Sequence, residues 1–162
     1  MTNAKIIEKM VRFYNGNLHD IDHFLKVYAY ASAIGRLEGV DEDTLSTLEK
    51  AAIVHDIACP LCREKYGSAK GDYQEIESEA LLRPFLDEFD LSPDVLERII
   101  FIVSRHHTLT GVEGMDHRIL LEADFIVNAG EQALSPDAIR TFRDSVFETS
   151  SGKRILTDMY LL

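Results

Sequence analysis

The sequence predicts an all-α fold of about seven or eight helices in one domain. Apolar residues recur at steps of three and four along nearly the whole chain, and no segment shows the strict alternation that is typical of a half-buried strand. Prolines, which interrupt helices, number only four. A chain of 162 residues, 46% of them hydrophobic, suits a single domain over 1–162 with a substantial core and is short for two domains.

The expected helices follow one another with mostly short connections. The first, over 3–15, begins in an amphipathic stretch, and the second, over 19–38, begins in a polar segment where Asn17 or Asp20 provides the cap. Six more helices are expected over 42–58, 75–89, 93–107, 116–132, 136–148 and 152–160, each boundary being set to within about 2 to 4 residues. The starts at Ser92–Asp94 and Ser135–Asp137 are clearly marked, because each offers a serine cap, a proline at the first helical position and an early acid.

The connection from Cys59 to Tyr73 stands apart from the others. It is about as long as an unstructured loop becomes in a compact domain unless the loop has a function. Its net charge is +1, whereas the rest of the chain sums to −12. We therefore expect this loop to take part in the function of the protein.

Charge and cysteine content exclude several classes of protein. A net charge of −11 argues against binding to duplex nucleic acid or to an acidic membrane face. No window approaches the roughly 18 apolar residues of a membrane span, and the first residues do not resemble a secretory signal, so a cytoplasmic location is expected. Cys59 and Cys62 are too few and too close for a secreted disulfide framework, and we interpret them as two thiols without a metal-binding or redox role.

Four polar residues lie where the helical pattern calls for apolar ones. His55 and Asp56 end a stripe formed by Leu45, Leu48 and Ala52, and His23 shares a face with apolar residues at helical spacing. Asp124 lies within the apolar segment 119–127. A buried carboxylate costs several kcal/mol unless it is protonated, paired or bound to a metal. A divalent cation would satisfy all four side chains, since neutral imidazole and ionised carboxylate are its usual ligands.

Simpler explanations account for some of these residues one at a time. The dipeptide His-Asp is weak evidence, and the copy at His19-Asp20 is expected to be an ordinary helix start. A core histidine bonded to a carbonyl would explain His23 or His55 separately, but it would not explain the buried acids. His117, beside an acid near a helix start, is expected at the surface.

The order His23, His55-Asp56 and Asp124, each in a helix of an all-α chain, resembles the HD domain of metal-dependent phosphohydrolases, as a small single-domain member. The resemblance covers about residues 19–131. It implies an HD-type helical bundle around a metal held by these four residues, with Asp56 as the bridging ligand if a second ion binds. Members with two metals add further histidines, and here His106 and His107 end one helix, with one of them expected to face the site.

A second metal position is less complete in this sequence. Similar small members place a histidine at the start of the helix after the loop, where this chain offers Glu75, Glu77 and Glu79, and we place Glu77 at that position. Because of this departure, the sequence does not decide whether one or two metal ions bind, since an acid in the first turn of a helix often interacts only with the helix dipole. Candidates for binding the substrate phosphate are the basic residues of the loop and those near the ligands, namely Arg63, Lys65, Lys70, Lys26 and Arg105.

The sequence thus predicts a phosphohydrolase that acts on a small phosphorylated metabolite or nucleotide through a metal-activated water, with Asp56 orienting the water or acting as base. The mixed nitrogen and oxygen ligands suit Mn, Fe, Co, Ni or Zn better than Mg. Two alternatives are a metal- or nucleotide-binding sensor without catalysis and a diiron oxygenase of the HD type. The oligomeric state, homo-oligomer included, and the substrate are not set by the sequence.

Overall fold

The computed structural model describes residues 2–162, which form helices joined by turns and loops, with no strand among them. The helices are α1 (Thr2–Phe13), α2 (Leu18–Leu37), α3 (Glu42–Val54), α4 (Cys59–Tyr66), α5 (Gly71–Leu86), the short 3₁₀-helix η1 (Asp87–Phe89), α6 (Pro93–Val103), α7 (Gly114–Glu131), α8 (Pro136–Val146) and α9 (Ser150–Tyr160). The predicted all-α class is confirmed.

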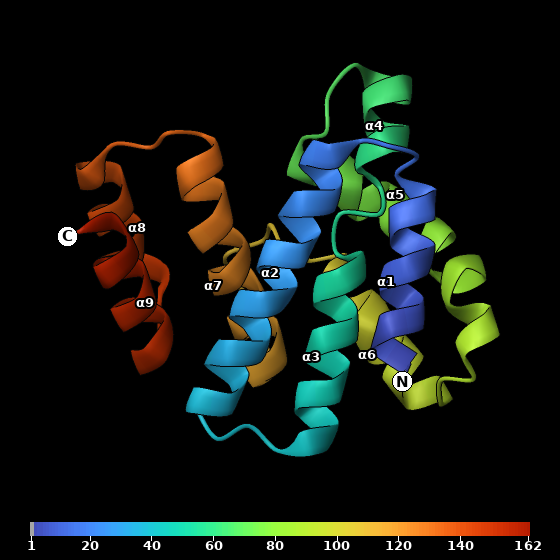
Figure 1. The fold of residues 1–162 in the computed structure, drawn as a ribbon, viewed down its shortest axis with the longest axis horizontal. Coiled ribbons are helices and arrows are strands. Elements are labelled where there is room, and N and C mark those ends of the chain that lie inside the picture. Colours follow the sequence, from blue (N-terminus) through green and yellow to red (C-terminus); the bar gives the residue numbers. More distant parts are fainter. Residues whose placement is uncertain (1) are drawn as a thin grey trace.

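Helices α2, α3 and α7 pack on one another and form the centre of the molecule (Figure 1). Helix α1 packs against α3, and α6 packs against α3 and α5. Helices α8 and α9 pair with each other at the end of the molecule that carries the C-terminus (Figure 1). The three central helices therefore carry the side chains that meet in the interior.

The predicted helix starts are confirmed by their caps. The side chain of Asn17 accepts a hydrogen bond from the backbone N–H of Asp20 at 3.2 Å and so caps α2. Ser92 and Ser135 cap α6 and α8 in the same way, each followed by proline at the start of the helix. Each such cap contributes about 1 kcal/mol by satisfying a backbone donor at the helix end.

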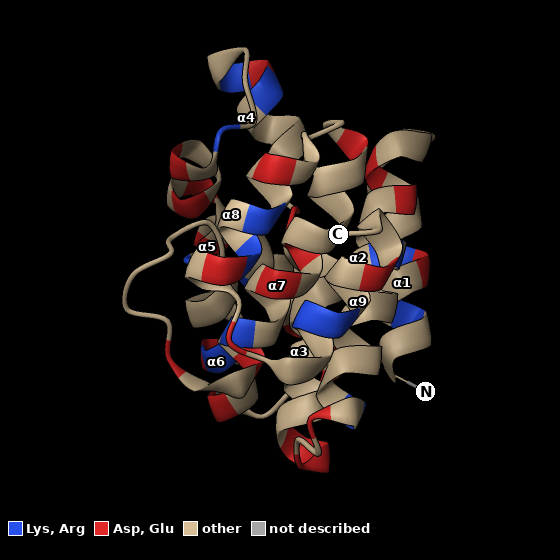
Figure 2. Cartoon of the chain, turned by 90° about the vertical axis from the view of Figure 1, so that its left-hand side faces the viewer, with Lys and Arg blue, Asp and Glu red and all other residues tan. Residues whose placement is uncertain are grey.

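The segment Cys59–Tyr73 is not the unstructured loop that we expected. Its first part forms α4, which has Pro60 in its first turn and is capped at its C-terminal end by Gly67 in the left-handed conformation (φ 70°). Its last part belongs to α5, which begins at Gly71 rather than near residue 75. Basic residues of α4 mark one end of the molecule in Figure 2, whereas acidic residues lie on most other helices.

Two helices end earlier than the apolar pattern suggested. Helix α3 ends at Val54 rather than 58, and α6 ends at Val103 rather than 107. After each end, backbone N–H groups bond the carbonyl three residues back, as in Ile57 to Val54 and His106 to Val103. Such tight turns keep near-helical dihedral angles, so the helical spacing of side chains continues past the last α-helical residue.

The apolar face of α2 is the one that the sequence predicted. Phe24, Val27, Ala31 and Ile34 are fully buried in the core, on the same face as His23. Burial of each large apolar side chain contributes about 1.5–3 kcal/mol. None of the helices within residues 2–162 is long and apolar enough to cross a membrane.

Candidate metal centre

Four side chains from three regions of the chain meet in the interior. The Nε2 atom of His23, on α2, lies 3.2 Å from Nε2 of His55 and 3.2 Å from Oδ1 of Asp124 on α7. The same nitrogen lies 3.3 Å from Oδ2 of Asp56. His55 and Asp56 lie in the turn after α3, and His55 Nε2 is 3.5 Å from each of the two carboxylates. The four residues that the sequence singled out are thus brought together.

Both His106 and His107 join this cluster, whereas we expected only one of them to face it. His106 Nε2 lies 3.6 Å from Oδ1 of Asp56, and the two imidazole rings have centroids 3.8 Å apart. Ligand atoms of His106, His107 and Asp124 all lie within 4.8 Å of one another. Both rings reach the cluster because the turn after α6 aims two successive side chains at it. The Cβ of His107 also packs against Gly71, where any side chain would collide with it.

Three of the histidines present the same ring nitrogen to the centre. Nδ1 of His55 donates to the carbonyl of Ala52 at 2.8 Å, and Nδ1 of His106 donates to the carbonyl of Val103 at 2.7 Å. Nδ1 of His23 lies 2.8 Å from a carboxylate oxygen of Glu131, which accepts its proton. With Nδ1 engaged in this way, each Nε2 offers a lone pair to a metal ion when the ring is neutral.

Two residues that support the cluster were missed from the sequence. Glu131 orients His23 and also pairs with Lys26 at 3.2 Å, and the amide of Asn128 donates to Oδ1 of Asp124 at 2.8 Å. Both lie on α7 at helical spacing from Asp124, Asn128 four residues later and Glu131 seven residues later. That spacing was the available signal, because residues four and seven apart lie on one face of a helix.

The pKa values of the cluster reflect its buried charges. Burial by itself would raise the pKa of Asp56 and Asp124, but the surrounding imidazoles outweigh it and hold both pKa values well below the usual range. Burial would lower the pKa of His23, yet its bonds to Asp124 and the charge of Asp56 raise that pKa to about 10. Burial and the neighbouring His106 lower the pKa of His107 to about 4. The centre therefore holds two ionised carboxylates that are stabilised by positive charge on the neighbouring imidazoles.

The cluster fits a divalent transition metal. Nε2 of His106 is buried and has no hydrogen-bond partner among the described residues, which is costly for a polar atom unless a ligand satisfies it. Three triads, His23–His55–Asp124, His55–Asp56–His106 and His106–His107–Asp124, each bring their ligand atoms within 4.8 Å of one another. Imidazole nitrogen and carboxylate oxygen together suit Mn, Fe, Co, Ni or Zn.

Glu77 does not join the cluster, and its placement at a second metal position is corrected. Its carboxylate pairs with Lys65 on α4 and accepts a hydrogen bond at 2.6 Å from the hydroxyl of Tyr66. The reason is that the expected loop forms helix α4, which packs beside α5 and places Lys65 where it pairs with Glu77. The residues available to a second ion are therefore His106 and His107, with Asp56 and Asp124 beside them.

Four of the five cations proposed for phosphate binding have partners within the protein. Arg63 pairs with Asp20, Lys65 with Glu77 and Lys26 with Glu131. Arg105 donates to the carbonyl of Phe101 at 3.4 Å and lies over its ring. Lys70, just before α5, forms no ion pair within residues 2–162. A phosphate-binding role for these residues stays a prediction.

His117 is buried, so the expectation of a surface position was wrong. Its ring is fully shielded from solvent and packs edge-on against Phe101. Its Nε2 lies 3.3 Å from the carbonyl of Arg105, and its Nδ1 accepts from the backbone N–H of Glu113. The loop between α6 and α7 folds back over the start of α7 and covers this ring.

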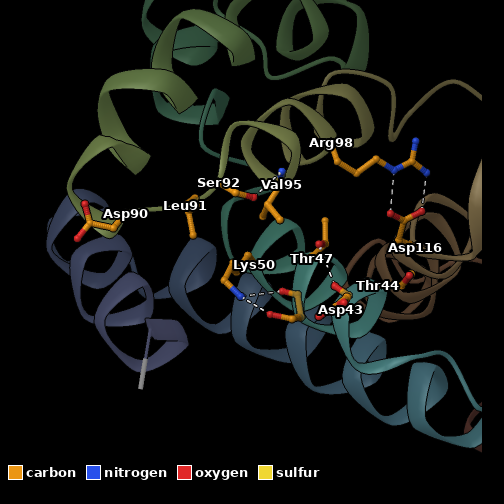
Figure 3. A pocket seen from close by; sticks show the side chains of 11 residues that line it. Asp43, Thr44, Thr47, Lys50, Asp90, Leu91, Ser92, Val95, Arg98 and Asp116 are labelled. Carbon is orange, nitrogen blue, oxygen red and sulfur yellow. Dashed lines mark hydrogen bonds and ion pairs between the residues drawn. The ribbon is translucent and has the colours of Figure 1, made fainter.

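A cavity of about 240 Å³ opens beside the cluster and is lined by His106, His107 and Asp124. A larger cavity of about 590 Å³, between α3 and the start of α6 (Figure 3), contains none of the clustered histidines or acids. There the Arg98 guanidinium pairs with both oxygens of Asp116, and the Lys50 ammonium donates to Ser46. Of these two cavities, the smaller one borders the candidate centre.

Comparison with known proteins agrees with this site. A model of the HD domain family matches residues 20–139, a range that contains every member of the cluster. The chain belongs to the HD domain family. This HD domain also resembles the crystal structure of a predicted HD superfamily hydrolase from an uncultured Thermotogales bacterium, with a TM-score of 0.69 and 24% sequence identity. The match covers 98% of this chain and 84% of that one, and it supports the fold. No curated protein matches the chain significantly.

Proposed function

We propose that this HD domain hydrolyses phosphoric esters of a small phosphorylated metabolite or nucleotide, using a divalent metal. The observation that supports it best is the convergence of three imidazole Nε2 atoms and two ionised carboxylates beside a cavity. Membership in a family of which many members are metal-dependent hydrolases agrees with this activity.

The residues of the cluster have separable roles in the proposed reaction. His23, His55, Asp56 and Asp124 would hold the first ion, and His106 and His107 would hold a second one. When bound, a divalent ion lowers the pKa of a water molecule by several units and polarises the phosphoryl oxygens. Asp56 reaches both parts of the cluster, because Oδ2 lies near His23 and His55 while Oδ1 lies near His106. It is therefore the residue best placed to orient the attacking water.

The outer partners keep this arrangement rigid. Glu131 fixes the ring of His23, two backbone carbonyls fix His55 and His106, and Asn128 fixes the carboxylate of Asp124. Hydrogen bonds of this kind hold each ligand in one rotamer and one tautomer, so little reorganisation is needed when a metal binds.

The test is elemental analysis of the purified chain, followed by assays on a panel of phosphomonoesters and nucleotides with each metal restored. We expect Asp56→Ala to lose both bound metal and turnover, because it removes a carboxylate that is shared by both parts of the cluster. The matched control is Asp158→Ala, since Asp158 is an exposed acid on α9 that should retain both. Full turnover by Asp56→Ala would contradict the proposal.

The oxygenase alternative has one supporting observation, namely that both His106 and His107 face the cluster and would complete a two-metal site. Loading with iron in the absence of oxygen, followed by exposure to oxygen, distinguishes the two reactions. A diiron optical signature that responds to oxygen would favour the oxygenase, whereas phosphatase turnover with Mn in air would favour the proposed function. Stable ligand binding without any turnover would instead favour a sensor.

A further inference from the structure

The cavity beside the metal centre joins the polar residues of the cluster to a wall of apolar side chains. Part of this wall comes from α7, where Leu121 and Phe125 lie four residues apart on one face, next to Asp124. The ring of Phe125 stacks on that of Phe142 from α8, with centroids 3.7 Å apart and planes 3° from parallel. Leu109, from the loop after α6, lies at the rim of this cavity and is 48% exposed.

The polar residues that line this cavity are His106, His107 and Asp124 of the cluster, together with Asn128 and Gln132. Asn128 donates to Asp124, and its side-chain oxygen accepts a weak bond of 3.4 Å from Gln132. Gln132 is exposed, so it lies at the solvent side of the cavity. Within residues 2–162 no lysine or arginine lines the cavity, and Asp124 is its one acid. A second anionic group on a ligand would therefore find no counter-charge here.

The size of the cavity limits what it can hold. Its volume of about 240 Å³ lies below the range of roughly 300–1,000 Å³ that drug-sized ligands occupy. It corresponds to about eight water molecules at roughly 30 Å³ each. A single ring or a short branched chain is of this size.

We propose that this cavity binds the alcohol portion of the substrate and that this portion is a compact, uncharged and largely apolar group, with an aromatic ring as the best fit. The inference rests on the proposed phosphoesterase function and narrows its substrate class. The single phosphate lies at the metal centre, and the organic group lies between α7, α8 and the loop that carries Leu109. The apolar walls disfavour hydroxylated groups, and the lack of counter-charge disfavours carboxylated or multiply phosphorylated ones.

The experiment compares three phosphomonoesters of primary alcohols with the manganese-loaded protein, namely benzyl phosphate, 4-carboxybenzyl phosphate and glucose 6-phosphate. Their reacting groups are alike, so the differences report on the alcohol portion. We expect kcat/KM for benzyl phosphate to exceed that for each of the other two by about 100-fold. A ratio of ten or more supports the proposal, and a ratio below ten for either comparison overturns it.

Binding is measured separately by calorimetry with benzylphosphonate and 4-carboxybenzylphosphonate, which are not hydrolysed. Tighter binding of the uncharged compound by tenfold or more, without turnover of any ester, would keep the cavity assignment and reject the phosphoesterase function. Turnover without discrimination among the esters would keep the function and reject the cavity assignment. Neither binding nor turnover would reject both.

A variant at the rim gives an independent check. Leu109→Lys places an ammonium group beside the cavity, and because Leu109 is half exposed the fold should tolerate the change. We expect the preference for benzyl over 4-carboxybenzyl phosphate to fall by about tenfold or more. The matched control is Leu37→Lys, at the end of α2, where an exposed leucine does not line this cavity and the preference should be unchanged. An unchanged preference in Leu109→Lys would overturn the proposal.

Discussion

Replacement of Glu131 tests whether the partner of a histidine ligand controls metal affinity in this HD domain. The carboxylate of Glu131 lies 2.8 Å from Nδ1 of His23, so it fixes the ring whose Nε2 meets the two aspartates. Glu131→Gln keeps an oxygen that accepts the same hydrogen bond but removes the charge. Glu131→Ala removes the acceptor altogether and leaves the Nδ1 proton of His23 without its partner.

The magnitude follows from the difference between charged and neutral hydrogen bonds. A bond to a charged group contributes about 1.5–3 kcal/mol and a neutral one about 0.5–1.5 kcal/mol, so Glu131→Gln should lose about 1–1.5 kcal/mol. This corresponds to a roughly 5–13-fold weaker metal affinity, and the loss for Glu131→Ala should approach 100-fold. Competition with a chromogenic chelator measures both affinities.

The control separates the two partners of Glu131. Lys26→Met removes the ion pair of Glu131 with a half-exposed lysine but leaves the bond to His23. Its effect on metal affinity should be less than about twofold, because exposed ion pairs contribute little. If Glu131→Ala binds metal within threefold of the wild type, the supporting role of Glu131 is refuted.

Three further predictions concern stability. Burial lowers the pKa of His117 despite its hydrogen bond to the carbonyl of Arg105, so the folded state resists protonation of this ring. The free energy of unfolding should therefore fall as the pH drops below about 6.5, the pKa of histidine in the unfolded chain. Urea titrations at pH 7.5 and 5.5 should show a smaller decrease in the free energy of unfolding for His117→Asn than for the wild type. Gly152→Ala should cost about 1–3 kcal/mol, because a Cβ would collide with the buried carboxylate of Glu122, and an unchanged denaturation midpoint would contradict this reasoning. Leu48→Ala should cost about 2–5 kcal/mol in the same assay, since Leu48 is fully buried, and a loss below 1 kcal/mol would indicate that its site collapses without a cavity.

Helix starts were predicted well because their signals are local. Ser92 and Ser135 cap their helices through their own side chains and are followed by proline, so a few adjacent residues specify each start. The early ends of α3 and α6 could not be read from the sequence, because tight turns prolong the helical spacing. Helix α4 was missed for a different reason. Its many charged residues are typical of a loop, and only the tertiary structure shows that Arg63 and Lys65 form ion pairs with residues on other helices.

The four central residues of the cluster were predicted from the sequence because charged side chains occupy positions that should be buried. His23, His55, Asp56 and Asp124 stood on apolar helix faces, where a lone charge is too costly to bury, so a shared partner was required. The supporting role of Glu131 could not be inferred in the same way, because an acid at the end of a helix has an ordinary explanation at the surface. Only its 2.8 Å distance to a residue 108 positions away gives it a function.

The sequence by itself determined the helical class, the helix starts and the four residues whose burial needs compensation, because these depend on spacing and on the intrinsic cost of burying charge. Tertiary structure decided which further side chains reach the centre: both His106 and His107 join it, while Glu77 is held by α4. It also decided the shape and polarity of the cavity beside Asp124. These features depend on how separate helices pack against one another, and the distances between their side chains are set by that packing rather than by the order of residues along any one helix.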